Sequence, residues 1–196
     1  MSVLATGSAD PTLTNWTKFE GNPVVLNTGR DPTGAWRTKD QDEWRAVTFD
    51  GQVFFSSSGS DFRTWSRANG TAGFPTGECP SLMPLPPPAP GSTRETNPTI
   101  THVFKHGGSW HDNYAVGHYD DGPAGTAGTW TTVPTVAGQR ADGDPTLNVG
   151  SAYAAKDFVA KGRRILWTWG FGLPVSHFSS VAVMPVSLAI IVIASS

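Results

Sequence analysis

Apolar residues recur along the chain in short runs, and no window keeps the 3.6-residue apolar period of an amphipathic helix. The runs are rich in tryptophan, valine, phenylalanine and threonine, and glycine, aspartate and proline separate them. Short, regularly spaced runs of this kind are typical of β-strands. They predict an all-β fold, which can be a sandwich, a barrel or a propeller.

The clearest predicted strands are residues 44–49 and 52–56, with Asp50-Gly51 between them. An Asp-Gly pair between two such runs is a strong hairpin signal, because both residues tolerate the positive φ of a two-residue turn. A third strand is expected at residues 64–67. Three neighbouring strands with short connections predict an antiparallel meander.

The same pattern returns after a proline-rich segment in the middle of the chain. Residues 100–105 and 113–119 are predicted to be strands, joined by a His-Gly-Gly-Ser connection at residues 106–109. Further strands are expected at residues 129–131, 152–158 and 164–169. The meander is therefore expected to repeat.

The C-terminal segment differs in composition from the rest of the chain. Residues 181–194 are apolar except for Pro185 and Ser187. A membrane-spanning helix needs roughly 18 or more apolar residues, so this run is short for one. A buried strand pair, a tail anchor and a tail foreign to the preceding domain remain alternatives.

Composition narrows the class of protein. Glycine (22) and proline (16) together stay below the share of roughly 25–30% that indicates disorder, and eight tryptophans and ten phenylalanines supply apolar area for a core. A formal net charge of -2 gives no basic footprint for nucleic acid. The first 20 residues lack the basic start and apolar run of a secretory signal peptide, so the location of the protein is left open.

Cysteine and histidine usage indicates neither a disulfide nor a metal site. The single cysteine excludes an internal disulfide and a Cys-based zinc cluster. The five histidines lack His-Glu-x-x-His spacing, and no cofactor is expected. Cys79 is interpreted as a small buried thiol that fills space.

Two carboxylates stand out as candidates for chemistry. Glu78 lies between a glycine and a Cys-Pro pair, which predicts a carboxylate presented by a stiff loop, although a surface turn has the same pattern. Asp31, within Gly29-Arg30-Asp31-Pro32, is presented in a similar way. A pair of carboxylates is what glycoside cleavage requires.

These motifs resemble glycoside hydrolase family 32, the family of invertases, inulinases and fructosyltransferases. Arg30-Asp31-Pro32 is similar to its Arg-Asp-Pro motif, and Glu78-Cys79 is similar to its Glu-Cys motif. The resemblance extends over about residues 8–171, and its remaining matches are residues 8–17, 21–24, 33, 36–37, 60–62, 65, 80–86, 150, 153–156 and 163–169.

The resemblance implies a fold and roles for individual residues. Residues 1–172 would form a partial five-bladed β-propeller of about three antiparallel blades, followed by the apolar tail 173–196. Glu78 would be the general acid/base, with its pKa raised by a nearby carboxylate. Asp31 would stabilise the transition state. Substrate contacts are expected from Arg30, Trp36 and Trp167, and Trp169 offers a further apolar face.

The implied activity is that of a β-fructofuranosidase, which hydrolyses or transfers fructosyl units of sucrose or fructans by a retaining mechanism. The expected partner is a small carbohydrate; neither nucleic acid nor a membrane is expected. The family suggests an extracellular or vacuolar location. These 196 residues contain no Trp-Met-Asn-Asp-Pro-Asn-Gly-like motif for the nucleophile, so an incomplete site is expected.

Two other classes of function remain open. A non-catalytic carbohydrate-binding remnant of the family would keep the grip of Asp31 and Glu78 on a fructosyl unit without turnover. A membrane-tethered interaction protein would rest on the apolar tail alone.

Overall fold

The computed structural model confirms an all-β protein. No α-helix occurs among the residues it describes, and the one helical turn is the 3₁₀ segment Ser58–Ser60. The described residues are 5–6, 16–26, 29–39, 43–60, 62–85, 100–108, 111–134, 146–147, 152–160, 163–170, 183–184 and 188–194. The family-like segment 8–15 and the connecting residue Ser109 lie outside these ranges.

Most strands belong to three four-stranded sheets. The first sheet contains, in spatial order, β3 (Trp36–Arg37), β4 (Glu43–Val47), β5 (Val53–Ser57) and β6 (Ser66–Arg67). The second contains β7 (Glu78–Pro84), β8 (His102–Gly108), β9 (His111–Asp120) and β10 (Thr129–Thr132). The third contains β11 (Ala152–Ala160), β12 (Arg163–Gly170), β14 (Leu188–Ala194) and β13 (Val183–Met184). A separate ribbon pairs β1 (Ala5–Thr6) with β2 (Thr17–Lys18).

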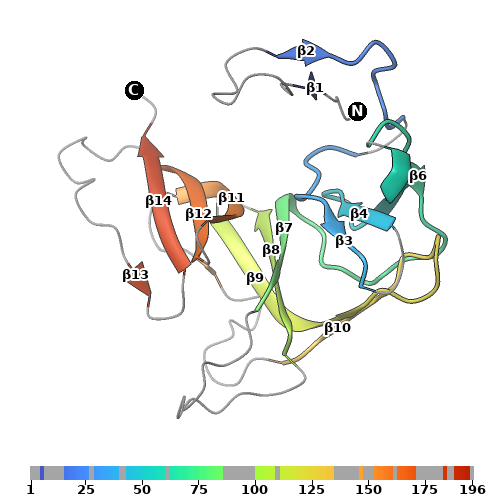
Figure 1. Cartoon of the computed structure of the whole chain (residues 1–196). Coiled ribbons are helices and arrows are strands. Elements are labelled where there is room, and N and C mark those ends of the chain that lie inside the picture. The colour runs from blue at the N-terminus through green and yellow to red at the C-terminus, as the bar shows by residue number, and fades with distance from the viewer. Residues whose placement is uncertain are drawn as a thin grey trace.

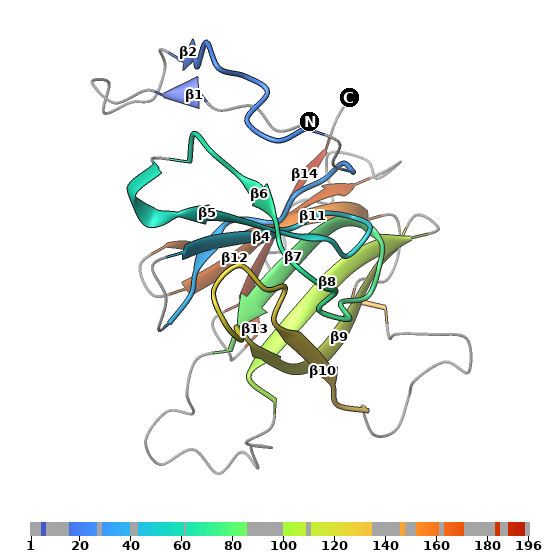
Figure 2. The ribbon, with the colours of Figure 1, turned by 90° about the vertical axis from the view of Figure 1, so that its right-hand side faces the viewer.

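The three sheets are arranged radially. Their first strands, β3, β7 and β11, lie toward the middle of the molecule in Figure 1, and β6, β10 and β13 lie toward the outside. In the view turned by 90° the sheets overlap, and the β1–β2 ribbon lies above them (Figure 2). The first two sheets are meanders that start at the centre and run outward, which is the arrangement of propeller blades, whereas in the third sheet β14 lies between β12 and β13.

The predicted hairpin at Asp50-Gly51 forms, but with a longer loop than expected. The Thr48 N–H donates to the Gln52 carbonyl (3.0 Å), and the Gly51 N–H donates to the Thr48 carbonyl (2.9 Å). Only Gly51 of the Asp-Gly pair has a positive φ, of 75°. The two-residue turn is therefore wrong, and a three-residue loop that ends on a left-handed glycine takes its place.

In the second sheet the strands extend into the predicted connection. The register pairs His106 with Asn113 and Gly107 with Asp112, so residues 106–108 belong to β8 rather than to a loop. The strands predicted at 129–131, 152–158 and 164–169 are confirmed as β10, β11 and β12. The glycine-rich composition of residues 106–108 did not indicate a strand, because their strand pairing depends on β9.

Part of the apolar C-terminal segment lies in the third sheet. β14 runs parallel to β12, with Arg164 opposite Leu188, and β13 pairs antiparallel with β14. No helix in the described part of the chain is long and apolar enough to cross a membrane. The boundary at residue 172 stays a prediction.

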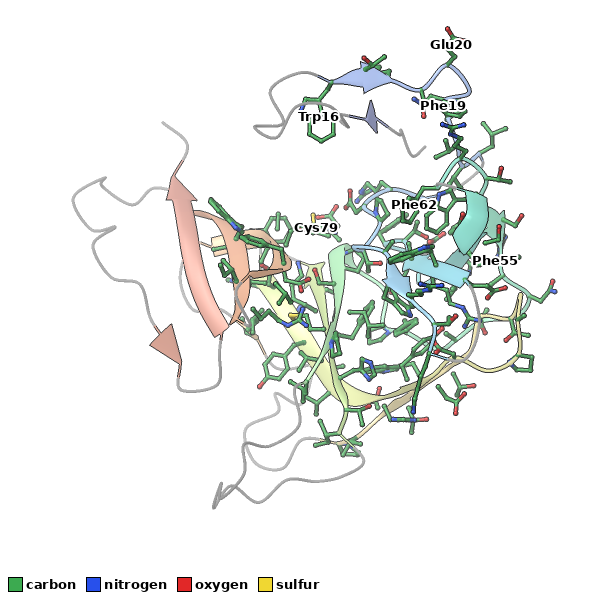
Figure 3. The ribbon with its side chains drawn as sticks, in the orientation of Figure 1. Trp16, Phe19, Glu20, Phe55, Phe62 and Cys79 are labelled. Carbon is green, nitrogen blue, oxygen red and sulfur yellow. The ribbon has the colours of Figure 1, made fainter. Side chains whose placement is uncertain are left out.

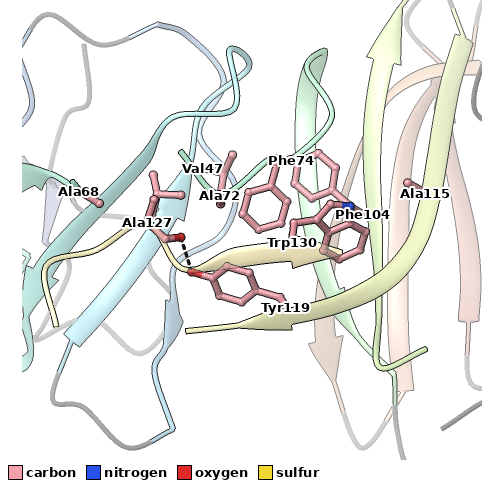
Figure 4. Close-up of a cluster of buried hydrophobic side chains, with 10 residues drawn as sticks. Val47, Ala68, Ala72, Phe74, Phe104, Ala115, Tyr119, Ala127 and Trp130 are labelled. Atoms are coloured by element: carbon pink, nitrogen blue, oxygen red, sulfur yellow. Dashed lines mark hydrogen bonds between the residues drawn. The ribbon is translucent and has the colours of Figure 1, made fainter. Parts of the chain in front are cut away.

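The main core lies between the first and second sheets and is aromatic. The Phe74 ring stacks at 4.7 Å on Phe104 and at 5.4 Å on Trp130, and it also contacts Tyr119 (Figure 4). The Tyr119 hydroxyl donates to the Ala127 carbonyl (3.0 Å). Val47 of β4 and Val53 of β5 belong to the same buried cluster, so this aromatic core joins the two sheets.

A buried ion pair ties the same two sheets together. Arg45 of β4 is fully buried and lies 3.1 Å from the Glu43 carboxylate. Its guanidinium also donates to the Tyr119 hydroxyl (2.9 Å), and Glu43 accepts the Gly125 N–H (2.9 Å). Arg45 therefore contacts β9 of the second sheet, and Glu43 contacts the connection between β9 and β10.

We expect Arg45→Met to lower the free energy of unfolding by about 3–5 kcal/mol, because it leaves the Glu43 carboxylate buried without its cation. Urea unfolding of the full chain measures this difference. The double variant Arg45→Met/Glu43→Gln should recover part of the loss. A loss below about 1 kcal/mol, which is typical of an exposed ion pair, would contradict the buried pairing.

Candidate active site

The three inner strands share one local feature near their starts. A four-residue segment at the start of β7, at the start of β11 and shortly before β3 has its second residue in the left-handed conformation, although this residue is not glycine. The segments are residues 30–33, 78–81 and 153–156, and the left-handed residues are Asp31 (φ 56°), Cys79 (φ 49°) and Ala154 (φ 59°). Such residues cost of order 1–3 kcal/mol each and cluster at functional sites.

Two of these segments are β-bulges. The β7–β8 register shifts by one residue between Glu78 and Ser81, and the β11–β12 register shifts between Tyr153 and Lys156. A bulge re-aims the side chain beside it. Glu78 is thus the first residue of a strand, where a ladder partner fixes it, and the predicted stiff loop is wrong.

Gly77 allows this strand to start close to its neighbour. A Cβ atom at Gly77 would lie 2.4 Å from the Gly107 carbonyl oxygen, and its φ of 157° also disfavours other residues. Figure 3 shows Cys79 at the beginning of β7, in the middle of the molecule. The glycine predicted to stiffen a loop instead permits close strand packing.

Side chains from the other two sheets meet at Glu78. The Arg30 guanidinium donates to its Oε1 atom, and the Tyr153 hydroxyl donates to its Oε2 atom. The side chains of Glu78 and Arg30 are 38% and 59% exposed, so a small solute can reach both. An accessible carboxylate is therefore held between a cation and a phenol.

These donors set the protonation of Glu78. The hydrogen bond from Tyr153, followed by that from Arg30, lowers the pKa of Glu78, because both favour the ionised form. The expected rise of this pKa is wrong. The carboxylate that was to cause it, Asp31, lies 3.6 Å from the Arg30 Nε atom, and the cation compensates its charge.

Tyr153 remains a donor in this arrangement. Burial, followed by the hydrogen bond to Glu78, raises the pKa of Tyr153. Its hydroxyl therefore keeps its proton at neutral pH. The sequence contained this residue within a family-like motif but gave no role for it, because the contact joins positions 75 residues apart.

Asp31 supports the bulge that carries Glu78. Its Oδ2 atom accepts the Cys79 N–H (3.2 Å) and lies 3.8 Å from the Cys79 sulfur. Burial, followed by the Asp31 charge, raises the pKa of the Cys79 thiol. A partly buried, protonated thiol agrees with the space-filling role predicted for it.

Lys156 joins the three inner segments. Its ammonium group donates to the carbonyls of Pro32 and Pro80, at 2.8 Å each. Burial, followed by the charge of Lys105, lowers the pKa of Lys156. Sequence reasoning missed this contact too, since carbonyl acceptors leave no mark in a motif.

The predicted tryptophan contacts are placed elsewhere in the sheets. Trp36 packs edge-on against Tyr119 at 5.6 Å, beside the aromatic core. Trp167 stacks on Phe158 at 6.0 Å in the third sheet. The side chain of Trp169 lies outside the described part, and sugar contact by these tryptophans stays a prediction. In the same described part, no three His, Cys, Asp or Glu side chains group as a metal site would require.

Sequence comparison identifies relatives over most of the chain. The family profile "Glycosyl hydrolases family 32 N-terminal domain" matches residues 3–177. The chain is similar to acid beta-fructofuranosidase 4, vacuolar, of Arabidopsis thaliana (30% identity, covering 82% of this chain and 26% of that protein). It is also similar to fructan 6-exohydrolase of Triticum aestivum (34% identity, 82% and 31%).

Structure comparison gives the same relationship. The chain is similar to fructan 1-exohydrolase IIa from Cichorium intybus, with a TM-score of 0.60 and 27% identity. A structure of a variant of that enzyme in complex with 1-kestose is similar too (TM-score 0.58, 26% identity). Each match covers 81% of this chain and 32% of the other, so the chain spans about a third or less of these relatives.

Tyr153→Phe should raise the pKa of Glu78, because it removes a hydrogen bond that favours the ionised carboxylate. The ¹³C chemical shift of the Glu78 side-chain carboxyl, followed by NMR against pH in labelled protein, measures this change. As a control, Tyr114→Phe removes a hydroxyl from a different strand, β9, and should leave the Glu78 titration unaltered. An unchanged Glu78 titration in Tyr153→Phe would show that the contact does not set its protonation.

Proposed function

Since the chain belongs to glycosyl hydrolase family 32 and forms an all-β partial propeller, we propose that it carries a fructosyl-cleaving site with Glu78 as general acid/base. The convergence of Arg30, Glu78 and Tyr153 from three sheets supports this proposal. A carboxylate that is both accessible and held by two donors suits proton transfer to and from a bound sugar.

Glu78 is ionised in this arrangement, which is the form needed to activate water in the second half of a retaining reaction. The first half needs a proton on Glu78, to protonate the leaving oxygen. A sugar that draws Arg30 onto its own hydroxyls removes a cation from the carboxylate. The pKa of Glu78 then rises, and its carboxylate binds a proton.

Asp31 is proposed to stabilise the positive charge that develops on the fructosyl ring. Its side chain is 26% exposed, so a sugar hydroxyl can reach it beside Arg30. Electrostatic stabilisation of this kind depends on groups fixed before the reaction. The Cys79 N–H supplies such fixation at one carboxylate oxygen.

The proposed substrates are β-fructofuranosides, such as sucrose or fructans, because the relatives are named as beta-fructofuranosidases and fructan exohydrolases. Hydrolysis and transfer share the first half of the reaction and differ in the acceptor. A retaining reaction also needs a nucleophilic carboxylate. No Asn-Asp-Pro-type motif supplies it within this sequence, so full turnover is expected to need the carboxylate of that motif.

A second candidate function is binding of fructosyl units without turnover. The fructosyl grip of Asp31 and Glu78, together with the absence of the nucleophile motif from this sequence, favours it. The two candidates share a ligand and differ in whether a glycosidic bond breaks.

Where the chain releases fructose from sucrose or 1-kestose, Glu78→Gln should reduce that release by about 10²–10⁴-fold, because the amide can neither donate nor accept the catalytic proton. Chromatography of the products of the full chain measures this release. Glu20→Gln, at an exposed position in the turn after β2, is the matched control and should retain full release. Measurable release that is equal in Glu78→Gln and the unmodified chain would refute the role of Glu78, and no release by the unmodified chain would refute catalysis by this chain.

Asp31→Asn should weaken binding of a fructosyl ligand, because it removes the charge that faces the sugar. Asparagine tolerates the left-handed conformation and keeps an oxygen for the Cys79 N–H, so the bulge should persist. NMR titration with 1-kestose measures the affinity. Binding without fructose release supports the second candidate, and neither binding nor release would refute both.

A further inference from the structure

A second buried ion pair lies in the β8–β9 hairpin, next to the site. The Lys105 ammonium of β8 is 2.9 Å from the Asp112 Oδ1 atom of β9, and both side chains are completely buried. The loss of hydration on burying such a pair often cancels the attraction between its charges. Stability alone therefore gives a weak reason for placing these residues here.

The second oxygen of Asp112 reaches into the third sheet. Its Oδ2 atom accepts the Ala155 N–H at 2.9 Å, in a buried environment. Ala155 belongs to the β11 bulge and follows the left-handed Ala154. A charge-assisted hydrogen bond at this N–H favours the bulged backbone over a regular ladder.

The same hairpin also contacts the ring of Tyr153. A Cβ atom at Gly107 would lie 3.0 Å from the Tyr153 Cε2 atom and 3.2 Å from its hydroxyl oxygen. Gly107 is paired with Glu78 on one side and with Asp112 on the other. One hairpin therefore holds the backbone beside Tyr153 and shapes the space for its ring.

We infer that Lys105 and Asp112 are a positioning pair that holds the Tyr153 hydroxyl on Glu78 by fixing the β11 bulge. Lys105 neutralises Asp112, Asp112 fixes the Ala155 N–H, and the bulge directs Tyr153 toward the carboxylate. Neither residue touches the sugar. The inference rests on the proposed role of Glu78 for its functional meaning, and on the described contacts for its geometry.

Two double variants of the full chain test the inference at matched charge. Lys105→Met/Asp112→Leu replaces the pair with apolar side chains, which buried pairs tolerate, but it removes the acceptor for the Ala155 N–H. Lys105→Met/Asp112→Asn is equally uncharged and keeps an amide oxygen as acceptor. The readout is the NMR titration of the Glu78 carboxyl, with urea unfolding measured in parallel.

In Lys105→Met/Asp112→Leu we expect the Glu78 pKa to rise as far as it does in Tyr153→Phe, with no further rise when Tyr153→Phe is added. Lys105→Met/Asp112→Asn should titrate as the unmodified chain does. Glu43→Ala, which disrupts the buried pair of the first sheet, should reduce stability without moving the Glu78 titration. If Lys105 and Asp112 served stability alone, Lys105→Met/Asp112→Leu would likewise reduce stability without moving the Glu78 titration.

Equal Glu78 titrations in the two double variants would overturn the inference, as would a rise that adds to that of Tyr153→Phe. If Lys105→Met/Asp112→Leu does not fold, Lys105→Met/Asp112→Ala takes its place, because it also removes the acceptor and leaves no unpaired charge, and the same rise is expected. Fructose release and 1-kestose binding by the unmodified chain are measured separately. Their absence would refute the proposed function, while the Glu78 titration would still decide the positioning role.

Discussion

The site depends on a backbone constraint that is repeated in three sheets. The side chains of Arg30, Glu78 and Tyr153 meet because the residue after each of them is in the left-handed conformation. None of these following residues is glycine, so each conformation costs free energy that surrounding contacts must offset. In two sheets a carboxylate of the preceding sheet does so: Asp31 accepts the Cys79 N–H, and Asp112 accepts the Ala155 N–H.

The charges around Glu78 follow from this geometry. Arg30 interacts with both carboxylates, so its positive charge offsets the repulsion between the two anions. Lys156 donates to backbone carbonyls rather than to a carboxylate, and it links the first and second inner segments to the third. The result is an ionised Glu78 in the absence of sugar. In the proposed role of general acid/base, Glu78 would need its substrate to change its protonation.

The fold could be predicted largely from local patterns, whereas the site could be predicted only in part. Short apolar runs indicated most strands, and Asp50-Gly51 indicated a hairpin, because these signals act between neighbours in the chain. The Arg-Asp-Pro and Glu-Cys motifs led to Asp31 and Glu78. The strand position of Glu78, the contact with Tyr153 and the pair Lys105–Asp112 arise between distant segments. No local signal in the sequence indicates such contacts. The predicted direction of the Glu78 pKa shift was wrong for that reason.

The double task of Asp31 affects how any substitution there is interpreted. Its carboxylate is expected to face the sugar, and it also accepts a hydrogen bond from the bulge that carries Glu78. Alanine would remove the charge and the acceptor together, and it tolerates the left-handed conformation less well. Asparagine removes the charge alone. A difference between the two variants would therefore report the supporting role of Asp31, because catalysis by charge is lost in both. Asp112 gives the same kind of support to the bulge of the third sheet, and its side chain is completely buried. Substitutions at Asp112 therefore test support of a bulge separately from contact with a sugar.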